Sequence, residues 1–235
     1  MTGVQTCALP IYPIKWTGKV GASAALVRGN TDSTSVSLGF DAARRSDILR
    51  LSVAGSYFTE EQKDLSSKES HMTADNWYLK GQADWFFTQK NFFYANVKYE
   101  RDRIALLDYR FMPGIGYGYQ WVERDNLNFS TEAGLTYTDE EYMDNGEKRD
   151  FMTARFAYHV DYTVYTKVKL YHNLEYIPNL EDSGIFLVNA DAGVLAPLTD
   201  RLSLDAKILY AYNSSPADDR YRTDTRYLVG LSWLF

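Results

Sequence analysis

Apolar and polar residues alternate with a period of two along almost the whole chain. In the last segment, for example, Tyr227, Val229 and Leu231 fall on one phase, and Arg226 and Ser232 fall on the other. Alternation over about ten residues is typical of a β-strand with one apolar face, and no segment has a convincing helical period. We therefore predict twelve strands, which cover residues 15–28, 34–43, 48–58, 76–86, 92–101, 110–121, 126–137, 150–160, 164–176, 185–197, 202–212 and 223–235.

Charged residues separate the two phases of these strands. Asp, Glu, Lys and Arg make up 24% of the chain, yet apart from segment ends the apolar phase carries none of them. A lysine or arginine that faces lipid costs about 2–4 kcal/mol at the bilayer midplane, whereas the core phase of a soluble β-sandwich needs no such exclusion at strand ends. We therefore expect the apolar phase to face lipid and the polar phase to face the lumen of a barrel.

Aromatic residues gather on the apolar phase at both ends of the strands, with Ala, Val and Leu between them. Such rings at the two membrane interfaces are typical of an outer-membrane barrel. At one end they are Tyr57, Trp77, Tyr99, Phe111, Tyr137, Tyr176, Phe186, Tyr212 and Tyr227. At the other end they are Trp16, Phe40, Trp85, Phe93, Trp121, Phe129, Tyr158, Trp233 and Phe235.

The connections alternate between short turns and longer polar loops. Long loops are predicted at Thr59–Asp75, Thr138–Arg149 and Asn213–Arg222. Short turns at one end and long loops at the other are typical of bacterial outer-membrane barrels, which have an even number of strands. The predicted fold class is all-β, a twelve-stranded antiparallel transmembrane β-barrel, with both termini in the periplasm and the long loops outside the cell.

Composition agrees with this interpretation. The chain has 235 residues, a formal net charge of −6 and 45% hydrophobic residues. This length is typical of a single domain. No run approaches 18 apolar residues, which excludes a membrane-spanning helix. The acidic balance argues against a nucleic-acid partner. The single cysteine, Cys7, excludes an intrachain disulfide and thiolate metal sites, and we predict no metal and no cofactor.

Residues 1–11 match the translation of a sequencing-adapter primer. We interpret this segment as an artefact, although a short natural N-terminal arm is the alternative, and we assign the barrel domain to residues 12–235. On this interpretation the true start of the protein is missing, and a native signal peptide has been lost with it. Cys7 would then also be foreign to the protein.

Several short motifs resemble the YdiY-like family of salt-induced outer-membrane proteins, a domain of unknown function. They are Trp16-Thr17-Gly18, Arg28-Gly29-Asn30-Thr31, residues 113–119 (PGIGYGY) and the ending Leu231–Phe235. The resemblance spans residues 16–235 and implies a Gram-negative outer membrane, with outer-membrane lipid and lipopolysaccharide as surroundings. It also implies a role in the envelope under osmotic or salt stress. Trp233 and Phe235 are the predicted assembly signal for the barrel-assembly machinery.

The lumen phase carries charges of both signs in near balance. This pattern favours a paired network that fills the barrel, and the alternative is a narrow channel that selects small polar solutes or ions. The predicted lumen cations are Lys19, Arg50, Lys80, Lys98, Arg155, Lys167, Lys169, Lys207 and Arg226. The predicted lumen anions are Asp41, Asp84, Glu100, Glu132, Glu175, Asp191, Asp205 and Asp224.

Three glycines at alternate positions, Gly114, Gly116 and Gly118, also face the lumen in this phasing. No helix follows them, so a nucleotide-binding loop is excluded, and we expect them to leave room for large neighbours. The predicted outer loops are acidic, with 18 acidic against 9 basic residues. They form either a solvated, repulsive surface or a site at which divalent cations bridge to lipopolysaccharide.

His172 is predicted to face lipid near the outer end of its strand, which would suit a barrel lipase with a lipid-facing Ser–His pair. Its predicted neighbours are Met152, Ala154, Phe186 and Val188, none of which is a nucleophile. We therefore predict no catalytic residues and no enzymatic activity. The function predicted from the sequence is an outer-membrane barrel with a largely charge-paired lumen.

Overall fold

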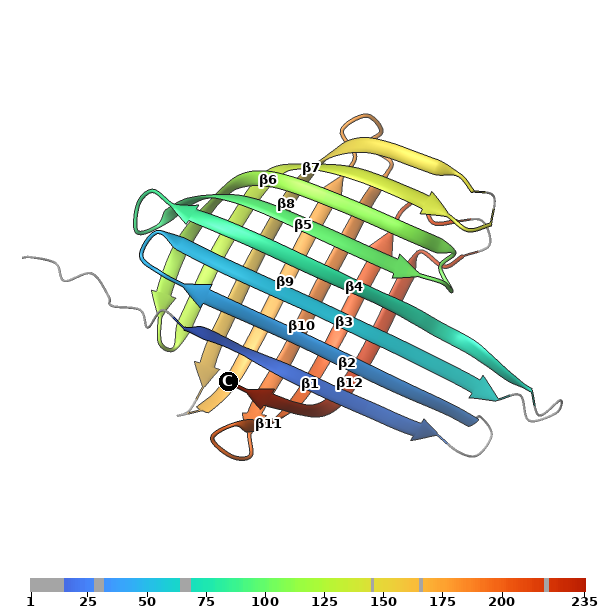
Figure 1. Cartoon of the computed structure of the whole chain (residues 1–235), viewed down its shortest axis with the longest axis horizontal. Helices are drawn as coiled ribbons and strands as arrows, with labels where there is room; N and C mark the ends of the chain where they lie inside the picture. The colour runs from blue at the N-terminus through green and yellow to red at the C-terminus, as the bar shows by residue number, and fades with distance from the viewer. Residues whose placement is uncertain (1–14, 28–31, 64–68, 145, 165–166, 218–219) are drawn as a thin grey trace, which may run out of the picture.

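In a computed structural model the chain forms one closed antiparallel barrel of twelve strands, in which each strand pairs with its neighbours in sequence and the last pairs with the first (Figure 1). The structure describes residues 15–27, 32–63, 69–144, 146–164, 167–217 and 220–235, so residues 1–11 lie outside it. The strands are β1 (Trp16–Val27), β2 (Asp32–Arg45), β3 (Leu49–Lys63), β4 (Ser70–Phe86), β5 (Asn91–Asp102), β6 (Leu107–Arg124), β7 (Leu127–Tyr142), β8 (Lys148–Val164), β9 (Val168–Pro178), β10 (Phe186–Pro197), β11 (Leu202–Asn213) and β12 (Thr223–Leu234).

All twelve predicted strands are present, and the fold class is confirmed. No helix in the described ranges is long and apolar enough to cross a bilayer. The start of β1 and the end of β12 lie at the end of the barrel that also carries the turns 46–48, 87–90, 125–126 and 198–201 (Figure 1). We call this the short-turn end, and the opposite one the hairpin end.

Two of the three long loops predicted at the hairpin end, Thr59–Asp75 and Thr138–Arg149, are largely wrong, because they are mostly strand, whereas the third, Asn213–Arg222, agrees with the interval between the end of β11 and the start of β12. β3 continues to Lys63 and β4 begins at Ser70, so only residues 64–69 of the predicted loop Thr59–Asp75 lie between strands. In the same way, β7 continues to Tyr142 and β8 begins at Lys148. Beyond the lipid the outward face of a strand meets water instead of hydrocarbon, so the alternation that marks a strand fades there while the backbone ladder continues.

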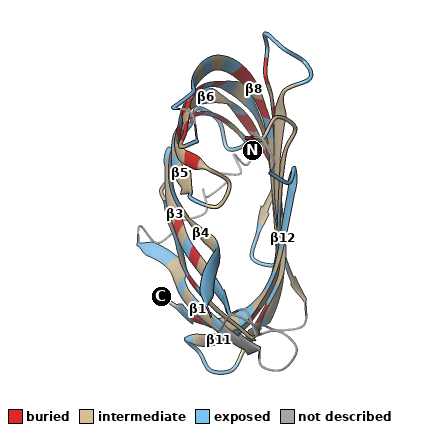
Figure 2. Ribbon diagram, turned by 90° about the vertical axis from the view of Figure 1, so that its right-hand side faces the viewer, coloured by how far each residue is buried: buried red, intermediate tan, exposed pale blue. Residues whose placement is uncertain are grey.

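The barrel closes through a short seam. β1 pairs with β12 over four residues, Lys19–Ala22 against Leu231–Leu234. By contrast, β2 pairs with β3 over fourteen residues. Figure 2 looks into the barrel, whose wall is elongated, with β6 and β8 at one narrow end and β1 and β11 at the other. Most buried side chains come from β3 to β9, so the interior is filled mainly on that side.

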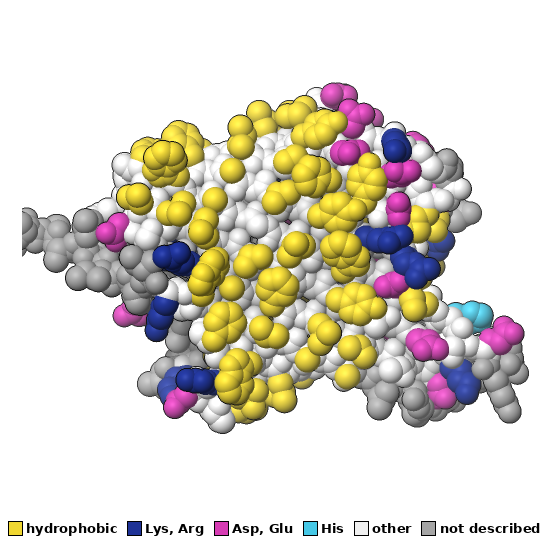
Figure 3. Space-filling view, in the orientation of Figure 1, with side chains coloured by type: hydrophobic (Ala, Val, Ile, Leu, Met, Phe, Trp, Pro, Cys, Tyr) yellow, Lys and Arg dark blue, Asp and Glu magenta, His cyan; other side chains and the backbone are white. Residues whose placement is uncertain are grey.

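The outer surface carries the predicted apolar belt. Figure 3 shows hydrophobic side chains over the middle of the wall, and Lys, Arg, Asp and Glu gathered towards its two ends. Aromatic residues from both predicted rings are exposed on this outer face: Tyr57, Trp77, Tyr99 and Phe111 towards the hairpin end, and Trp85, Phe93, Trp121 and Trp233 towards the short-turn end. Exposure of so many large apolar side chains, otherwise costly in water, is what a lipid-facing wall requires.

The glycines of β6 give large inward side chains their space. A Cβ atom built on Gly116 would lie 2.5 Å from the Tyr94 ring, and one built on Gly118 would lie 2.1 Å from the Phe92 ring. Real Cβ atoms are not found at such distances, so only glycine fits at these positions. Phe92 and Tyr94 are thereby buried, at 0% and 3% exposure, which agrees with the steric role expected for the glycines.

Candidate functional site in the barrel lumen

The guanidinium of Arg155 is the centre of a buried ion cluster halfway along the barrel. Its Nε donates to Glu175 Oε1 at 2.6 Å, and its Nη1 donates to Glu132 Oε2 at 2.7 Å. Glu132, Arg155 and Glu175 lie on three neighbouring strands, β7, β8 and β9. Arg155 is 3% exposed, and its guanidinium lies over the Tyr94 ring on β5 at 5.2 Å. Charge-assisted hydrogen bonds of this length are among the strong ones in proteins.

Two side chains of β4 reach this cluster from the other wall of the barrel. Lys80 Nζ donates to Glu175 Oε1 at 3.4 Å, and Gln82 Nε2 donates to Glu132 Oε1 at 2.8 Å. β4 and β9 are five strands apart around the wall, so the first of these contacts crosses the lumen. We call Lys80, Gln82, Glu132, Arg155 and Glu175 the waist network.

The network continues towards the short-turn end through Asp84. This carboxylate is 1% exposed and accepts hydrogen bonds from Gln82 Nε2 at 2.8 Å and from Arg50 Nε. Arg50 Nη1 donates in turn to Gln120 Oε1 of β6 at 2.9 Å. Arg50 also lies over the ring of Phe92, at 4.9 Å. A polar chain therefore connects β3, β4 and β6 across the interior.

A second buried cluster lies nearer the hairpin end. Arg110 Nε donates to Glu140 Oε2 at 2.6 Å, and Arg110 Nη1 donates to Glu100 Oε1 at 2.8 Å. Lys98 Nζ lies 2.6 Å from the other carboxylate oxygen of Glu100. The side chains of Arg110 and Glu140 are 9% and 5% exposed. Sequence reasoning missed both residues: Arg110 was the first residue of a predicted strand but was left out of the lumen charges, and Glu140 was assigned to a loop although it lies on the inward phase of β7.

A third cluster lies beside the seam, with side chains from β1, β2, β9, β11 and β12. Lys19 Nζ donates to Asp205 Oδ2 at 3.2 Å and lies 3.8 Å from Asp41 Oδ1. Asp205 also accepts from Tyr171 OH at 3.1 Å and from Ser232 Oγ at 3.1 Å. The Asp41 side chain is 53% exposed although it points inwards, so this side of the lumen is more open than the waist.

The other predicted lumen charges divide into four groups. Arg226 Nη1 donates to Asn76 Oδ1 of β4 at 2.9 Å, and Asp191 accepts from Asn173 at 2.8 Å. Lys169 Nζ lies 3.0 Å from Asp161 near the short-turn end. Lys207 and Asp224, within the described residues, have no charged partner within 4 Å. Lys167 lies outside the lumen, in the turn after β8, where it pairs with Asp200 at 3.3 Å.

His172 lies elsewhere on its strand than the sequence predicted. β9 begins at Val168, so His172 lies nearer the short-turn end than the outer end. Its register partners are Val160 on β8 and Ala192 on β10, and the predicted neighbours were wrong. The imidazole stacks on Tyr158, with ring centroids 5.4 Å apart. Among the described residues, no group of three His, Cys, Asp or Glu side chains could hold a metal ion.

A closed antiparallel barrel with an even strand number, an apolar outer belt between two aromatic rings and a polar interior defines an outer-membrane β-barrel protein. Its family follows from a match over residues 20–235 to the profile described as "Protein of unknown function, DUF481". The chain belongs to this family. A comparison with curated proteins finds no match.

Solved structures with a similar fold are also outer-membrane barrels. An outer-membrane channel from Pseudomonas putida F1 has a TM-score of 0.53 at 11% identity, covering 100% of both chains. The NanC porin has a TM-score of 0.52 at 8% identity, covering 92% of this chain and 98% of its own. The translocator domain of the autotransporter NalP from Neisseria meningitidis has a TM-score of 0.50 at 11% identity, covering 93% and 86%. At these identities the likeness shows the fold alone.

Proposed function

We propose that this protein is a resident barrel of a Gram-negative outer membrane whose charge-paired lumen stiffens the wall and restricts the flow of solutes. The observation that supports the proposal is the waist network, because Lys80 and Gln82 reach from β4 to carboxylates on β9 and β7. Buried ion pairs with complete hydrogen bonding resist separation, since either partner alone would be an uncompensated charge. A hydrated solute would have to break these contacts in order to pass.

A role under osmotic or salt stress is the finer part of the proposal. It is supported by the resemblance to the YdiY-like salt-induced proteins. A barrel that anchors itself in the outer membrane while admitting little ion flow fits such a role. Growth of a deletion strain in medium of high salt, with and without the wild-type gene, tests it. Equal growth of both strains would contradict the stress role and leave the closed-barrel proposal standing.

A narrow channel is the second candidate. It is favoured by the more open side of the lumen near the seam, where the side chains of Asp41 and Lys169 are 53% and 42% exposed. It is also supported by the fold shared with a porin and with an outer-membrane channel. A path along this side would carry charges of both signs, so we expect weak ion selectivity if it conducts.

Single-channel recording in planar bilayers distinguishes the two candidates. For the closed barrel we expect silence from refolded wild-type protein and openings from the variant Arg155→Ala, which removes the centre of the waist network. Lys167→Ala is the matched control, because Lys167 is a cation outside the lumen. Steady, ion-selective openings of the wild type would refute the closed barrel, whereas silence from all three proteins would refute the channel.

We further propose that the barrel-assembly machinery recognises Trp233 and Phe235 on the last strand. Both rings are exposed on the outer face of β12 at the short-turn end, at 51% and 52%. The variant Phe235→Ala should reach the outer membrane in smaller amounts in cells, yet refold in detergent like the wild type. Poor refolding in detergent would instead indicate a structural role. We propose no hydrolase activity, since neither register partner of His172 is a nucleophile.

A further inference from the structure

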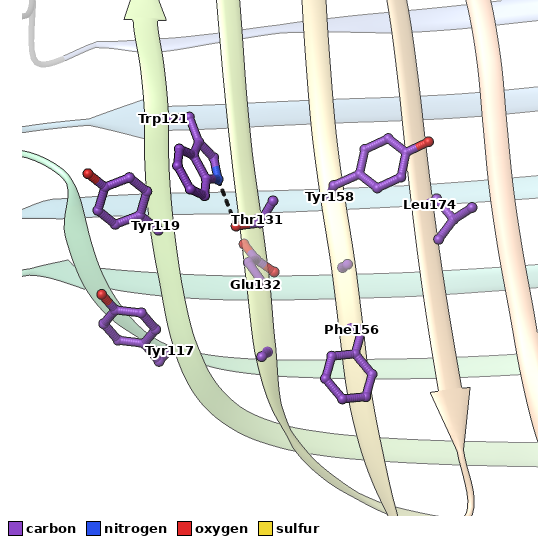
Figure 4. Close-up of a pocket in the computed structure, with 10 residues that line it drawn as sticks. Tyr117, Tyr119, Trp121, Thr131, Glu132, Phe156, Tyr158 and Leu174 are labelled. Atoms are coloured by element: carbon purple, nitrogen blue, oxygen red, sulfur yellow. Dashed lines mark hydrogen bonds between the residues drawn. The ribbon is translucent and has the colours of Figure 1, made fainter.

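A groove of about 550 Å³ lies on the outside of the barrel, over β6, β7, β8 and β9 (Figure 4). Eight of its ten lining residues project from the outward phase of these strands, and its walls include Trp121 and Tyr158, both members of the aromatic ring at the short-turn end. The groove is therefore continuous with the lipid-facing belt and lies in the half of the belt nearer the short-turn end. It lies on the opposite side of the wall from the lumen, and one of its lining residues, Glu132, also belongs to the waist network.

Large side chains on two sides and small ones between them create the groove. One wall is formed by Tyr117, Tyr119 and Trp121 of β6, and the other by Phe156 and Tyr158 of β8 together with Leu174 of β9. The floor is the intervening strand β7, where Thr131 and Ala133 face outwards. Figure 4 shows the two rows of rings on either side of this floor.

The wall on β6 is held in place by contacts at Trp121. Its indole Nε1 donates to Thr131 Oγ1 at 2.9 Å. Its ring also contacts Tyr119 edge-on, with centroids 4.7 Å apart, and stacks with Phe129 at 6.3 Å. On the opposite wall Tyr158 stacks with His172. These contacts keep the rings upright, so the groove does not close by collapse of its own walls.

The groove offers almost no polar atoms to an occupant. The hydroxyl of Thr131 already accepts from Trp121, and the carboxylate of Glu132 is bound inside the barrel by Arg155 and Gln82. The Tyr117 hydroxyl donates to Asn91 Oδ1, so the polar groups that remain are the phenols of Tyr119 and Tyr158 and the hydroxyl hydrogen of Thr131. Amphipathic rings of this kind lie at the level of the lipid headgroups. The chemistry therefore fits an apolar chain attached to a polar head near the short-turn end.

We propose that this groove binds one acyl chain of a phospholipid from the leaflet on the short-turn side. The chain lies along the floor at Ala133, and its headgroup lies near Trp121 and Tyr158. Packing between membrane-spanning surfaces uses small residues that let two backbones approach closely. Here the small residues are at the bottom of a groove with aromatic walls, so the flat wall of a second barrel cannot reach them, whereas a flexible chain can. The proposal holds whether or not the lumen conducts.

Photolabelling of the full chain in vesicles tests the proposal. The probe is a phosphatidylethanolamine with a diazirine in its acyl chain, and labelled sites are mapped by peptide mass spectrometry. In the wild type we expect labels concentrated on β6 to β8 around the groove. In Ala133→Trp an indole fills the floor, and labelling there should fall about tenfold, which corresponds to about 1.4 kcal/mol of binding free energy.

Two further variants keep the test decisive. Ala206→Trp adds the same indole to the outer face of β11, away from the groove, and should leave labelling at wild-type level. Phe156→Ala removes part of a wall and should lower labelling without filling the floor. Heat-dependent migration in gels shows that each variant is folded. Labelling spread evenly around the belt, labelling unchanged in Ala133→Trp, or cross-links between two copies of the chain through the groove would each overturn the proposal.

Discussion

Replacement of Arg155 by methionine should destabilise the barrel strongly, because it leaves buried carboxylates without their main partner. Two hydrogen bonds to charged groups are lost, at 2.6 and 2.7 Å. Glu175 keeps a cation, Lys80 at 3.4 Å, whereas Glu132 keeps only the amide of Gln82. One carboxylate thus becomes an uncompensated buried charge, and breaking a buried pair in this way costs about 3–5 kcal/mol.

The assay is urea unfolding of refolded protein in vesicles, followed by tryptophan fluorescence. With a urea dependence of about 1–3 kcal/mol per molar, a loss of about 3–5 kcal/mol should lower the midpoint by about 1–5 M in Arg155→Met. The matched control is Lys167→Met, which removes a cation whose partner Asp200 is 94% exposed. Solvent screening makes such exposed pairs contribute little, so its midpoint should not change.

A compensating variant tests the physical reasoning. If the cost of Arg155→Met comes from the isolated charge, the further change Glu132→Gln removes that charge and should restore a large part of the lost stability. Replacement of a buried ion pair by neutral groups of similar volume is often close to neutral. The reasoning is refuted if Arg155→Met unfolds at the same urea concentration as Lys167→Met, or if the double variant is no more stable than Arg155→Met alone.

Two further substitutions test the packing and the belt. Gly116→Ala forces a Cβ to within 2.5 Å of the Tyr94 ring and should lower the free energy of unfolding by about 1–3 kcal/mol in the same assay. In the control Gly39→Ala, the atom nearest to the new Cβ is 3.6 Å away, so this variant should unfold like the wild type. Leu135→Arg places a cation on the lipid-facing belt and should make insertion into vesicles less favourable by about 2–4 kcal/mol. The control Gln62→Arg, at the exposed tip of β3, should insert like the wild type. Equal behaviour within either pair would contradict the steric role of Gly116 or the assignment of the belt.

The strands could be predicted because the bilayer enforces the pattern that marks them. Between the two aromatic rings every second residue meets hydrocarbon, so a single charge on that phase would be costly, and the alternation stays clear. Past the rings this constraint ends. Glu140 was therefore assigned to a loop, and Arg110, the first residue of a predicted strand, was left out of the predicted lumen charges, although the two form one of the most buried ion pairs in the barrel.

Partners across strands could not be predicted, because alternation gives the face of a residue and not its position along the barrel. His172 was assigned to the correct face, yet its register partners are Val160 and Ala192. The contact between Lys80 and Glu175 depends further on the elongated cross-section, which brings opposite walls within reach. Nothing local in the sequence encodes that shape. Gln82 and Gln120 complete the polar chains inside the barrel. Both are uncharged, so a lumen network predicted from charged residues does not include them.

The short seam between β1 and β12 has a consequence for how the barrel folds and opens. Its two strands come from opposite ends of the chain, so forming this pairing closes the longest loop in the protein, and the entropy cost of closure grows with loop length. Four ladder pairs and two backbone hydrogen bonds between Gly18 and Phe235 offset that cost, against fourteen ladder pairs between β2 and β3. Contacts between residues far apart in sequence are slow to form. We therefore expect the seam to be the last part of the sheet to form and the first to exchange its amide hydrogens, while the strands around Arg155 remain protected.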